Sequence, residues 1–271
     1  MRYTDRTIVI TGASDGIGAE LARQLAPEGP RLVLGARSAE RLERVAAECR
    51  ARGARAIAVT ADVAIDDDCK RLVESAASEF GGIDVLVANA GMSMHARFDE
   101  IEDFSTFERL WRINCLGTIA CTRYAWPHLK TSRGQVVGIC SLAGRTGVPG
   151  RTTYCMTKFA QNGFLEALRI EAEDHGIAVT VVYPGVVATE TRRRGFNARG
   201  EPAGVSGLEE RGAMPVDQCV RQILAAMRAR RRELVMTSKA KVGLWLKLIA
   251  PRVVDGMARA ALKRQDSGSR I

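Results

Sequence analysis

Short apolar runs alternate along the chain with longer segments in which apolar residues recur every three or four positions. The short runs are rich in β-branched residues, which is typical of strands buried on both faces, whereas the longer periodicity is typical of amphipathic helices. Strands are predicted at Thr7–Thr11, Arg31–Gly35, Ala56–Thr60, Val85–Asn89, Gln135–Ser141, Ala178–Tyr183 and Glu233–Thr237. Helices are predicted at Ala19–Leu25, Ala39–Arg52, Asp66–Phe80, Phe104–His128, Thr152–His175 and Val216–Arg230. The alternation predicts an α/β fold, a Rossmann-like doubly wound parallel sheet of about seven strands with helices on both faces.

Two stretches lie outside this rhythm. Residues 190–212 are rich in Gly and Arg without clear periodicity, and residues 239–264 are basic and amphipathic, with an apolar stripe that includes Val242, Trp245 and Ile249. A chain of 271 residues with 46% hydrophobic content fits one domain. We expect a catalytic domain at residues 1–238 and an extension at 239–271. The extension is expected to pack on its own domain, on a partner subunit or on a membrane surface.

The positive charge is concentrated in the C-terminal region. Residues 1–189 carry 22 Lys and Arg against 23 Asp and Glu, whereas residues 190–271 carry 18 against 8, so the net charge of +9 arises after residue 189. The arginines there lack interleaved aromatic residues and form no recognised nucleic-acid module. No nucleic-acid partner is therefore predicted.

Cysteine usage and hydropathy bear on location. The seven cysteines form no CxxC pair and no Cys/His cluster, so no metal site is predicted and a reducing cytosol is favoured. The apolar run beginning at Thr7 leaves no room before it for a secretory signal. The apolar stretch 242–250 is short and interrupted by Lys247. We expect a cytoplasmic protein, with peripheral membrane contact through 239–264 left open.

The first predicted strand leads into a glycine-rich turn with the spacing GxxxGxG. Glycines allow a tight turn and a close approach of the backbone to a pyrophosphate, whose charge the free N–H groups and helix dipole stabilise. A turn that only joins a strand to a helix is the alternative. The residues predicted to bind the dinucleotide here are Gly12, Ser14, Asp15, Gly16, Ile17 and Gly18.

The carboxyl ends of the next three strands carry further candidates. Arg37 follows Ala36 where an acid would bind the ribose of NAD, which favours NADP(H) over NAD(H), although a solvated Arg is the alternative. Asp62-Val63 and Asn89-Ala90-Gly91 follow the third and fourth strands, at the edge where ligands bind. Alternatively, Asp62 caps the following helix and Asn89 serves a turn.

Tyr154 and Lys158 lie four residues apart in a predicted helix and therefore share one face. A nearby ammonium and the positive charge of an oxidised nicotinamide would favour the phenolate of Tyr154. Tyr154 could then exchange a proton with a substrate oxygen, Ser141 could hydrogen-bond that oxygen, and Lys158 could orient the ribose. The alternative is a Tyr and a Lys on an ordinary half-exposed helix.

From about residue 5 to residue 237 the chain resembles the short-chain dehydrogenase/reductase family. The matching motifs are TGxxxGxG at 11–18, Asp62, NAG at 89–91, Asn114, Ser141, YxxxK at 154–158, and Pro184-Gly185 followed by Thr189. Asp15 departs from the basic residue that NADP-preferring members often have before the second glycine.

The resemblance implies further roles. Asn114 would complete a tetrad with Ser141, Tyr154 and Lys158 and help to hold a water in a proton relay through Lys158. The nicotinamide would be held by Pro184, Gly185, Val187 and Thr189, and Tyr154 and Lys158 would also contact the cofactor. Residues 190–212 would form a substrate lid, and the helices beginning near Phe104 and Thr152 would form a homodimer or homotetramer.

These observations predict an NADP(H)-dependent oxidoreductase that interconverts a carbonyl and an alcohol on a small, mainly apolar substrate. The alternatives are a catalytically silent dinucleotide-binding regulator and a membrane-associated reductase of lipid-like or steroid-like substrates. Arg192, Arg193, Arg194 and Arg199 of the predicted lid could receive an acidic group, but a solvated loop face is favoured for them.

Overall fold

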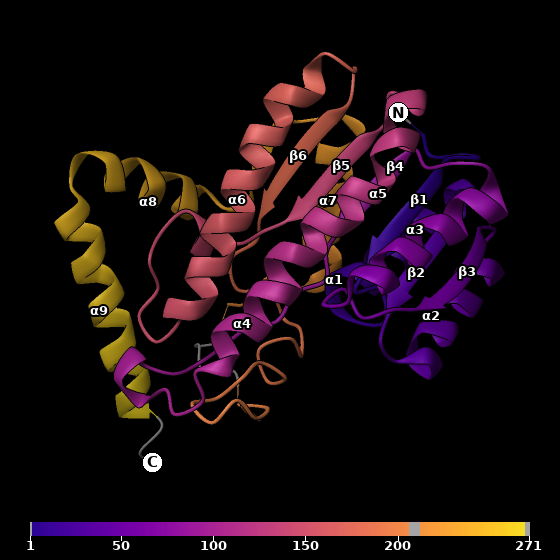
Figure 1. Cartoon of the computed structure of the whole chain (residues 1–271). Coiled ribbons are helices and arrows are strands. Elements are labelled where there is room, and N and C mark those ends of the chain that lie inside the picture. The colour runs from indigo at the N-terminus through magenta and orange to yellow at the C-terminus, as the bar shows by residue number, and fades with distance from the viewer. Residues whose placement is uncertain (1, 206–211, 269–271) are drawn as a thin grey trace.

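A computed structural model describes residues 2–205 and 212–268 and contains a seven-stranded sheet with the order β3-β2-β1-β4-β5-β6-β7 (Figure 1). All neighbouring strands in this sheet run parallel. The strands are β1 (Thr7–Thr11), β2 (Arg31–Ala36), β3 (Arg55–Thr60), β4 (Val85–Ala88), β5 (Gln135–Ile139), β6 (Ala178–Tyr183) and β7 (Glu233–Val235). The predicted doubly wound α/β fold is confirmed.

Helices cover both faces of the sheet. They are α1 (Gly16–Leu25), α2 (Ala39–Ala51), α3 (Asp66–Phe80), α4 (Ser105–Trp111), α5 (Gly117–Ser132), α6 (Thr152–Glu173), α7 (Val216–Arg228), α8 (Ser238–Ile249) and α9 (Pro251–Gly268). Short 3₁₀ turns lie at Ala26–Glu28 (η1), Phe98–Glu100 (η2) and Leu142–Gly144 (η4), and a π-helical turn (η3) lies at Arg112–Leu116.

The core is divided by the sheet into two apolar layers. Side chains alternate along β1, so Ile8 and Ile10 pack in one layer with residues of α1, α2 and α7, whereas Val9 packs in the other with residues of α3, α5 and α6. All three side chains are fully buried. Because both faces of each central strand are covered, the strands read as continuous apolar runs in the sequence.

The order of strands reverses between β1 and β4. β1 pairs with β2 on one side and with β4 on the other, and the two halves of the sheet grow outward from this point. In open α/β sheets the crevice at such a switch point, outside the carboxyl ends of the strands, is where ligands bind. The motifs that follow β1, β4 and β5 are therefore brought to one edge.

The predicted helix Phe104–His128 is interrupted in the structure. The π turn η3 separates α4 from α5, and Asn114 lies inside it. A π turn inserts an extra residue into the helical ladder and occurs often at functional sites. The amide of Asn114 bonds to the loop after β4, a tertiary contact that helical periodicity does not report.

Helices α8 and α9 form a hairpin at the outer edge of the molecule (Figure 1). The hairpin joins the domain through α8, which contacts β7 and packs Ala240 and Leu244 against the core. No helix within the described ranges is long and apolar enough to cross a membrane.

Candidate active site

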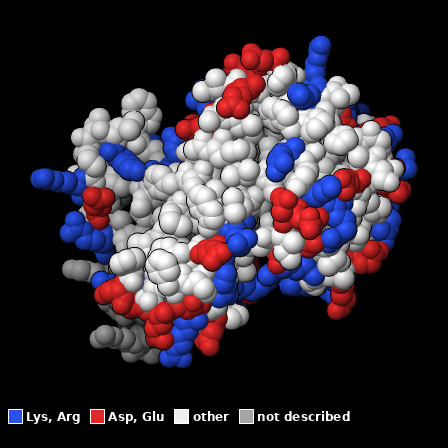
Figure 2. Space-filling view, viewed as in Figure 1, with Lys and Arg blue, Asp and Glu red and all other residues white. Residues whose placement is uncertain are grey.

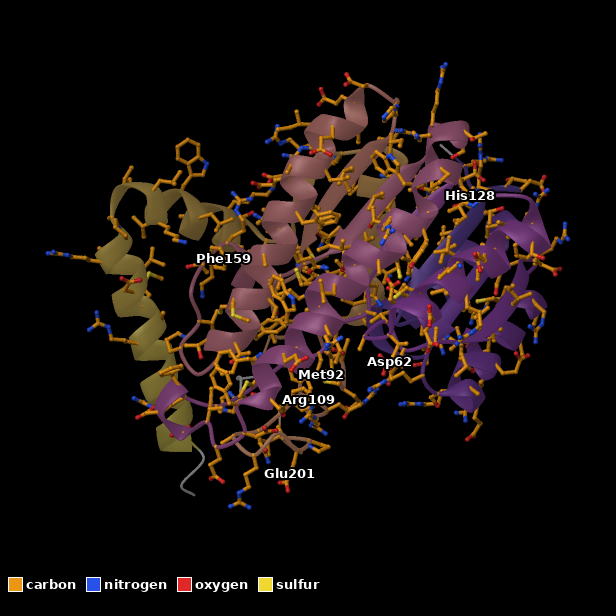
Figure 3. All side chains as sticks on the ribbon, in the orientation of Figure 1. Asp62, Met92, Arg109, His128, Phe159 and Glu201 are labelled. Atoms are coloured by element: carbon orange, nitrogen blue, oxygen red, sulfur yellow. The ribbon has the colours of Figure 1, made fainter. Side chains whose placement is uncertain are left out.

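A cleft of about 520 Å³ lies at the carboxyl edge of the sheet, where Figure 3 shows Asp62 and Met92. Its volume falls in the range of small-molecule and cofactor sites. Most of the predicted site residues line it: Gly12, Ser14, Asp15, Ile17, Arg37, Asp62, Val63, Asn89, Ala90, Gly91, Ser141, Tyr154, Lys158, Pro184, Gly185, Val187 and Thr189. Gly16, Gly18 and Asn114 are not among the lining residues.

The glycine loop after β1 needs its glycines for space. Gly12 has φ +65°, and a Cβ at this position would lie 2.9 Å from Cα of Ala90. A Cβ on Gly18 would lie 2.5 Å from Asn89 Nδ2 and from the Gly12 carbonyl oxygen. The loop therefore packs directly against the chain that follows β4, and it presents the N-terminus of α1 to the cleft, an arrangement that fits a pyrophosphate.

Asn89 fixes the glycine loop in place. Its side-chain Nδ2 donates to the carbonyl oxygens of Thr11 (2.9 Å) and Gly12 (3.2 Å). In return, the Thr11 hydroxyl oxygen accepts from the backbone N–H groups of Asn89 (3.0 Å) and Ala90 (2.9 Å). Asn89 thus joins the first and fourth strand ends and does more than serve a local turn.

Two arginines flank the end of β2. Arg37 and Arg41 both line the cleft, with side chains 63% and 45% exposed, so both can reach a ligand phosphate. Arg41 was not predicted, although its position four residues after Arg37 and near the start of a helix is a signal that could have found it. Arg41 Nε donates to the Ser38 hydroxyl oxygen (3.2 Å), which holds its guanidinium at this end of the cleft.

Asp62 does not cap α3. The N-cap of that helix is Ile65, and Asp62 Oδ1 instead accepts from the backbone N–H of Ala64 (3.0 Å). Asp62 Oδ2 lies 3.9 Å from Arg37 Nη1. The capping alternative is wrong because the Asp62 carboxylate hydrogen-bonds within the loop that precedes α3, beside the cleft.

The predicted lid reaches back over the glycine loop. Arg194 forms an ion pair with Asp15, and Arg41 Nη1 lies 3.8 Å from the same carboxylate. Burial opposes the ionisation of Asp15, but hydrogen bonds from Arg194 and the Gly16 N–H outweigh it and hold its pKa below the ordinary value. The acidic residue that departs from the family pattern is therefore paired with basic side chains from two other segments.

The sequence favoured a solvent-exposed loop face for the lid arginines, and this prediction is wrong for Arg192. Arg192 is only 9% exposed and donates to the Val187 carbonyl oxygen (3.1 Å). Arg193 and Arg199 lie at exposed positions near Glu190 and Glu102. Residues 206–211 of the predicted lid lie outside the described residues.

Tyr154 and Lys158 project from α6 into the cleft, beside Ser141 at the end of β5. Burial raises the pKa of Tyr154 to about 12, against the opposing effect of its hydrogen bond with Ser141. Burial also lowers the pKa of Lys158, whose Nζ donates to the Ile139 carbonyl oxygen (3.1 Å) and to Gln161 Oε1 (2.8 Å). The protein's own groups therefore favour the neutral phenol, whereas the sequence suggested a shift toward phenolate.

Asn114 is fully buried behind the cleft wall. Its Oδ1 accepts from the Met92 N–H (2.8 Å), and its Nδ2 donates to the Met92 carbonyl oxygen and to the Thr157 hydroxyl oxygen (both 2.9 Å). A Cβ on Gly91 would lie 3.2 Å from Asn114 Oδ1 and 3.6 Å from Lys158 Nζ, so both side chains flank the same glycine. The amide clamps the turn after β4 to α6.

Apolar side chains and one further arginine complete the wall of the cleft. Met92, Val148 and Leu142 line it, as does Arg151, which is only 4% exposed and was missed by sequence reasoning. Arg151 Nη1 donates to the Ser93 hydroxyl oxygen (2.8 Å). Because Arg151 precedes Tyr154 by three residues, helical spacing could have placed it on the same side.

The sequence profile of the family described as short chain dehydrogenase matches residues 6–199. The "Dehydrogenase/reductase SDR family protein 7-like" of Dictyostelium discoideum is 32% identical over 259 residues, which cover 93% of this chain and 80% of that protein. The "11-beta-hydroxysteroid dehydrogenase-like 4A" of Arabidopsis thaliana is 38% identical over 187 residues, covering 69% of this chain and 62% of that protein.

Solved structures agree with these relatives. An alcohol dehydrogenase from the archaeon Thermococcus sibiricus, complexed with 5-hydroxy-NADP, has a TM-score of 0.73 and 27% identity, with 85% of this chain and 95% of that chain covered. A short chain dehydrogenase/reductase from Burkholderia phymatum in complex with NAD has a TM-score of 0.82 at 20% identity, covering 93% and 96%, and supports the fold. The chain thus belongs to the short-chain dehydrogenase/reductase family, as an oxidoreductase acting on CH–OH or C=O groups.

Proposed function

We propose that the chain is an NADP(H)-dependent oxidoreductase that interconverts a carbonyl and an alcohol on a small, mainly apolar substrate. The observation that carries this proposal is one shared cleft. Tyr154 and Ser141, which can act on a substrate oxygen, line the same space as the glycine loop and Arg37. A silent dinucleotide-binding regulator would have no need for a buried proton donor in that space.

The proposed chemistry assigns each polar group one task. A bound nicotinamide supplies or accepts the hydride. During reduction the neutral phenol of Tyr154 donates its proton to the substrate oxygen, and the Ser141 hydroxyl hydrogen-bonds the same oxygen as its negative charge develops. Lys158 orients the ribose and contributes positive charge, while Asn114 keeps the turn after β4 against α6. With a pKa raised to about 12, Tyr154 is a neutral phenol at neutral pH and carries the proton that reduction requires.

The remaining predicted residues are proposed to bind the cofactor. Gly12, Ser14, Asp15, Gly16, Ile17 and Gly18 would form the pyrophosphate turn, with Asp62, Val63, Asn89, Ala90 and Gly91 beside it and Pro184, Gly185, Val187 and Thr189 at the nicotinamide. Arg37 and Arg41 support NADP(H), because two guanidiniums at one end of the cleft suit a 2′-phosphate.

Apolar side chains in the wall of the cleft support the proposed substrate class. Met92, Ile113, Leu142, Val148 and Val186 all line the cleft. The name of the Arabidopsis relative refers to hydroxysteroids, so steroid-like ketones belong in a substrate screen.

We also propose a homodimer or homotetramer formed through α4, α5 and α6. Figure 2 shows few charged residues over the middle of the molecule. Exposed apolar side chains on these elements include Trp111, Met156 and Phe159, and Leu116 is exposed in the turn η3 between α4 and α5. The seven free cysteines support a reducing compartment such as the cytosol. Residues 1–238 would form the catalytic domain, and 239–271 an extension.

The test compares purified wild type with Tyr154→Phe, using NADPH and NADH and a panel of aldehydes, ketones, quinones and steroids. We expect turnover by the wild type with NADPH preferred. Loss of one general acid typically costs about 100-fold to 10,000-fold in rate. Cofactor binding by fluorescence serves as the folding control for the variant. Binding of both cofactors without turnover of any substrate would favour the silent regulator.

A further inference from the structure

The α8–α9 hairpin exposes an apolar surface that no described part of the chain covers. On α8 the exposed residues are spaced so that they share one face of the helix. They are Val242 (65% exposed), Trp245 (72%), Leu248 (77%) and Ile249 (79%), and α9 adds Val253 (52%) and Met257 (55%). Ile249 and Val253 lie on either side of the corner between the helices, so the exposed surface continues from one helix to the other.

The hairpin is held to the domain by other residues. Leu244 packs against the core, and Lys247 Nζ donates to the Arg145 carbonyl oxygen (2.7 Å) and lies 5.4 Å from the centre of the Phe159 ring. α9 packs chiefly on α8. None of the described hairpin residues lines the cleft, so the apolar face is not a cover for this subunit's own site.

The charge of the hairpin identifies what could cover this face. Residues 238–260 contain Lys239, Lys241, Lys247, Arg252 and Arg259 against the single acid Asp255. All of these cations except Lys247 are exposed. Two such hairpins facing one another would bring like charges together in a chain of net charge +9, whereas anionic lipid headgroups would neutralise them.

We propose that the α8–α9 hairpin docks on an anionic lipid surface. The apolar face enters the headgroup boundary, with an exposed Trp suited to that depth, and the Lys and Arg side chains contact the phosphates. Lys247 joins the hairpin to the loop between β5 and α6, which contributes Leu142 and Val148 to the cleft. A docked hairpin would therefore hold the cleft close to a source of apolar substrate.

The proposal is tested by co-sedimentation of the full chain with vesicles, which requires no turnover and is independent of the proposed function. Vesicles of phosphatidylcholine alone are compared with vesicles that also contain phosphatidylglycerol, at low and high salt. The variant Trp245→Gln/Leu248→Gln removes apolar area, and its control Ile65→Gln/Ile170→Gln alters two exposed apolar residues outside the hairpin (52% and 70% exposed). Thermal melting and cofactor binding confirm that each variant is folded.

We expect the wild type and the control to bind the phosphatidylglycerol vesicles, more weakly at high salt and on phosphatidylcholine alone. The hairpin variant should partition about tenfold less, because two side chains no longer contribute buried apolar area. Lys239→Glu/Lys241→Glu should lose binding to the anionic vesicles, whereas the exposed pair Arg44→Glu/Lys70→Glu, which makes the same change in net charge, should not.

Two outcomes would overturn the proposal. The first is absence of wild-type binding to the anionic vesicles, and the second is equal binding by the wild type and the hairpin variants. If the wild type binds no vesicles and Trp245→Gln/Leu248→Gln also has a lower oligomeric mass in light scattering, the apolar face is assigned to a second copy of the chain.

Discussion

The proposed function predicts that replacing both Arg37 and Arg41 by Ala removes most of the preference for NADPH over NADH. The two guanidiniums lie on the wall of the cleft at the end of β2, and both are partly exposed. A hydrogen bond to a charged group contributes more than a neutral one, but solvent screening reduces the gain at exposed positions. We therefore assign about 1 to 1.5 kcal/mol to each arginine on the 2′-phosphate.

The combined loss of about 2 to 3 kcal/mol corresponds to roughly a 30-fold to 150-fold fall in the ratio of kcat/KM for NADPH to that for NADH. The assay is initial-rate reduction of one substrate with each cofactor. Arg44→Ala is the matched control. Arg44 lies on α2, as Arg41 does, but it pairs with Glu40 and is not among the residues that line the cleft. Removal of NADPH-specific binding should leave kcat/KM for NADH nearly unchanged.

An equal fall in kcat/KM with NADPH and with NADH would refute this reasoning, since it would show that the arginines support the cleft and do not recognise the phosphate. An unchanged ratio of the two kcat/KM values would refute it as well. The single variants separate the two contributions, and Arg37→Ala should have the larger effect if Arg41 remains partly engaged with Ser38 and Asp15.

Three further predictions follow from buried groups. Asn114→Ala should lower the free energy of unfolding by about 3 to 5 kcal/mol in urea titrations, because three hydrogen bonds are lost and their partners stay buried; a loss below about 1 kcal/mol would show that the turn relaxes freely. Gly18→Ala should abolish cofactor binding in calorimetry, because its Cβ would lie 2.5 Å from two polar atoms of the glycine loop and β4 end; unchanged affinity would contradict the tight packing. Burial raises the pKa of Tyr3 and Tyr183 from 10.0 to about 12, so the unfolded chain loses these two protons first as pH rises. The contribution of these two phenols to stability should therefore be intact below pH 10 and fall by roughly 3 kcal/mol per pH unit between pH 10 and 12. Unfolding at fixed urea concentration across this range, compared between the wild type and Tyr183→Phe, measures the share of Tyr183, and an unchanged slope in Tyr183→Phe would contradict the assignment.

The sequence predicted the fold and most of the cleft from local information. Apolar runs such as Thr7–Thr11 and Ala178–Tyr183 have the bounds of the observed strands. Because all the strands are parallel, residues that follow them in sequence, such as Asp62, Asn89 and Ser141, necessarily reach one edge of the sheet. The glycine spacing after β1 and the Tyr154/Lys158 pair are equally local.

Only the tertiary structure decided which distant groups meet and how much water they lose. Arg194 contacts Asp15, 179 positions earlier in the chain. Asn114 hydrogen-bonds the Met92 backbone from within a π turn, where the sequence periodicity predicted regular helix. The raised pKa of Tyr154 follows from burial, since a charged phenolate is costly where water is excluded. Long-range pairing and desolvation depend on the packing of the whole chain, so neither can be read from the spacing of residues along it.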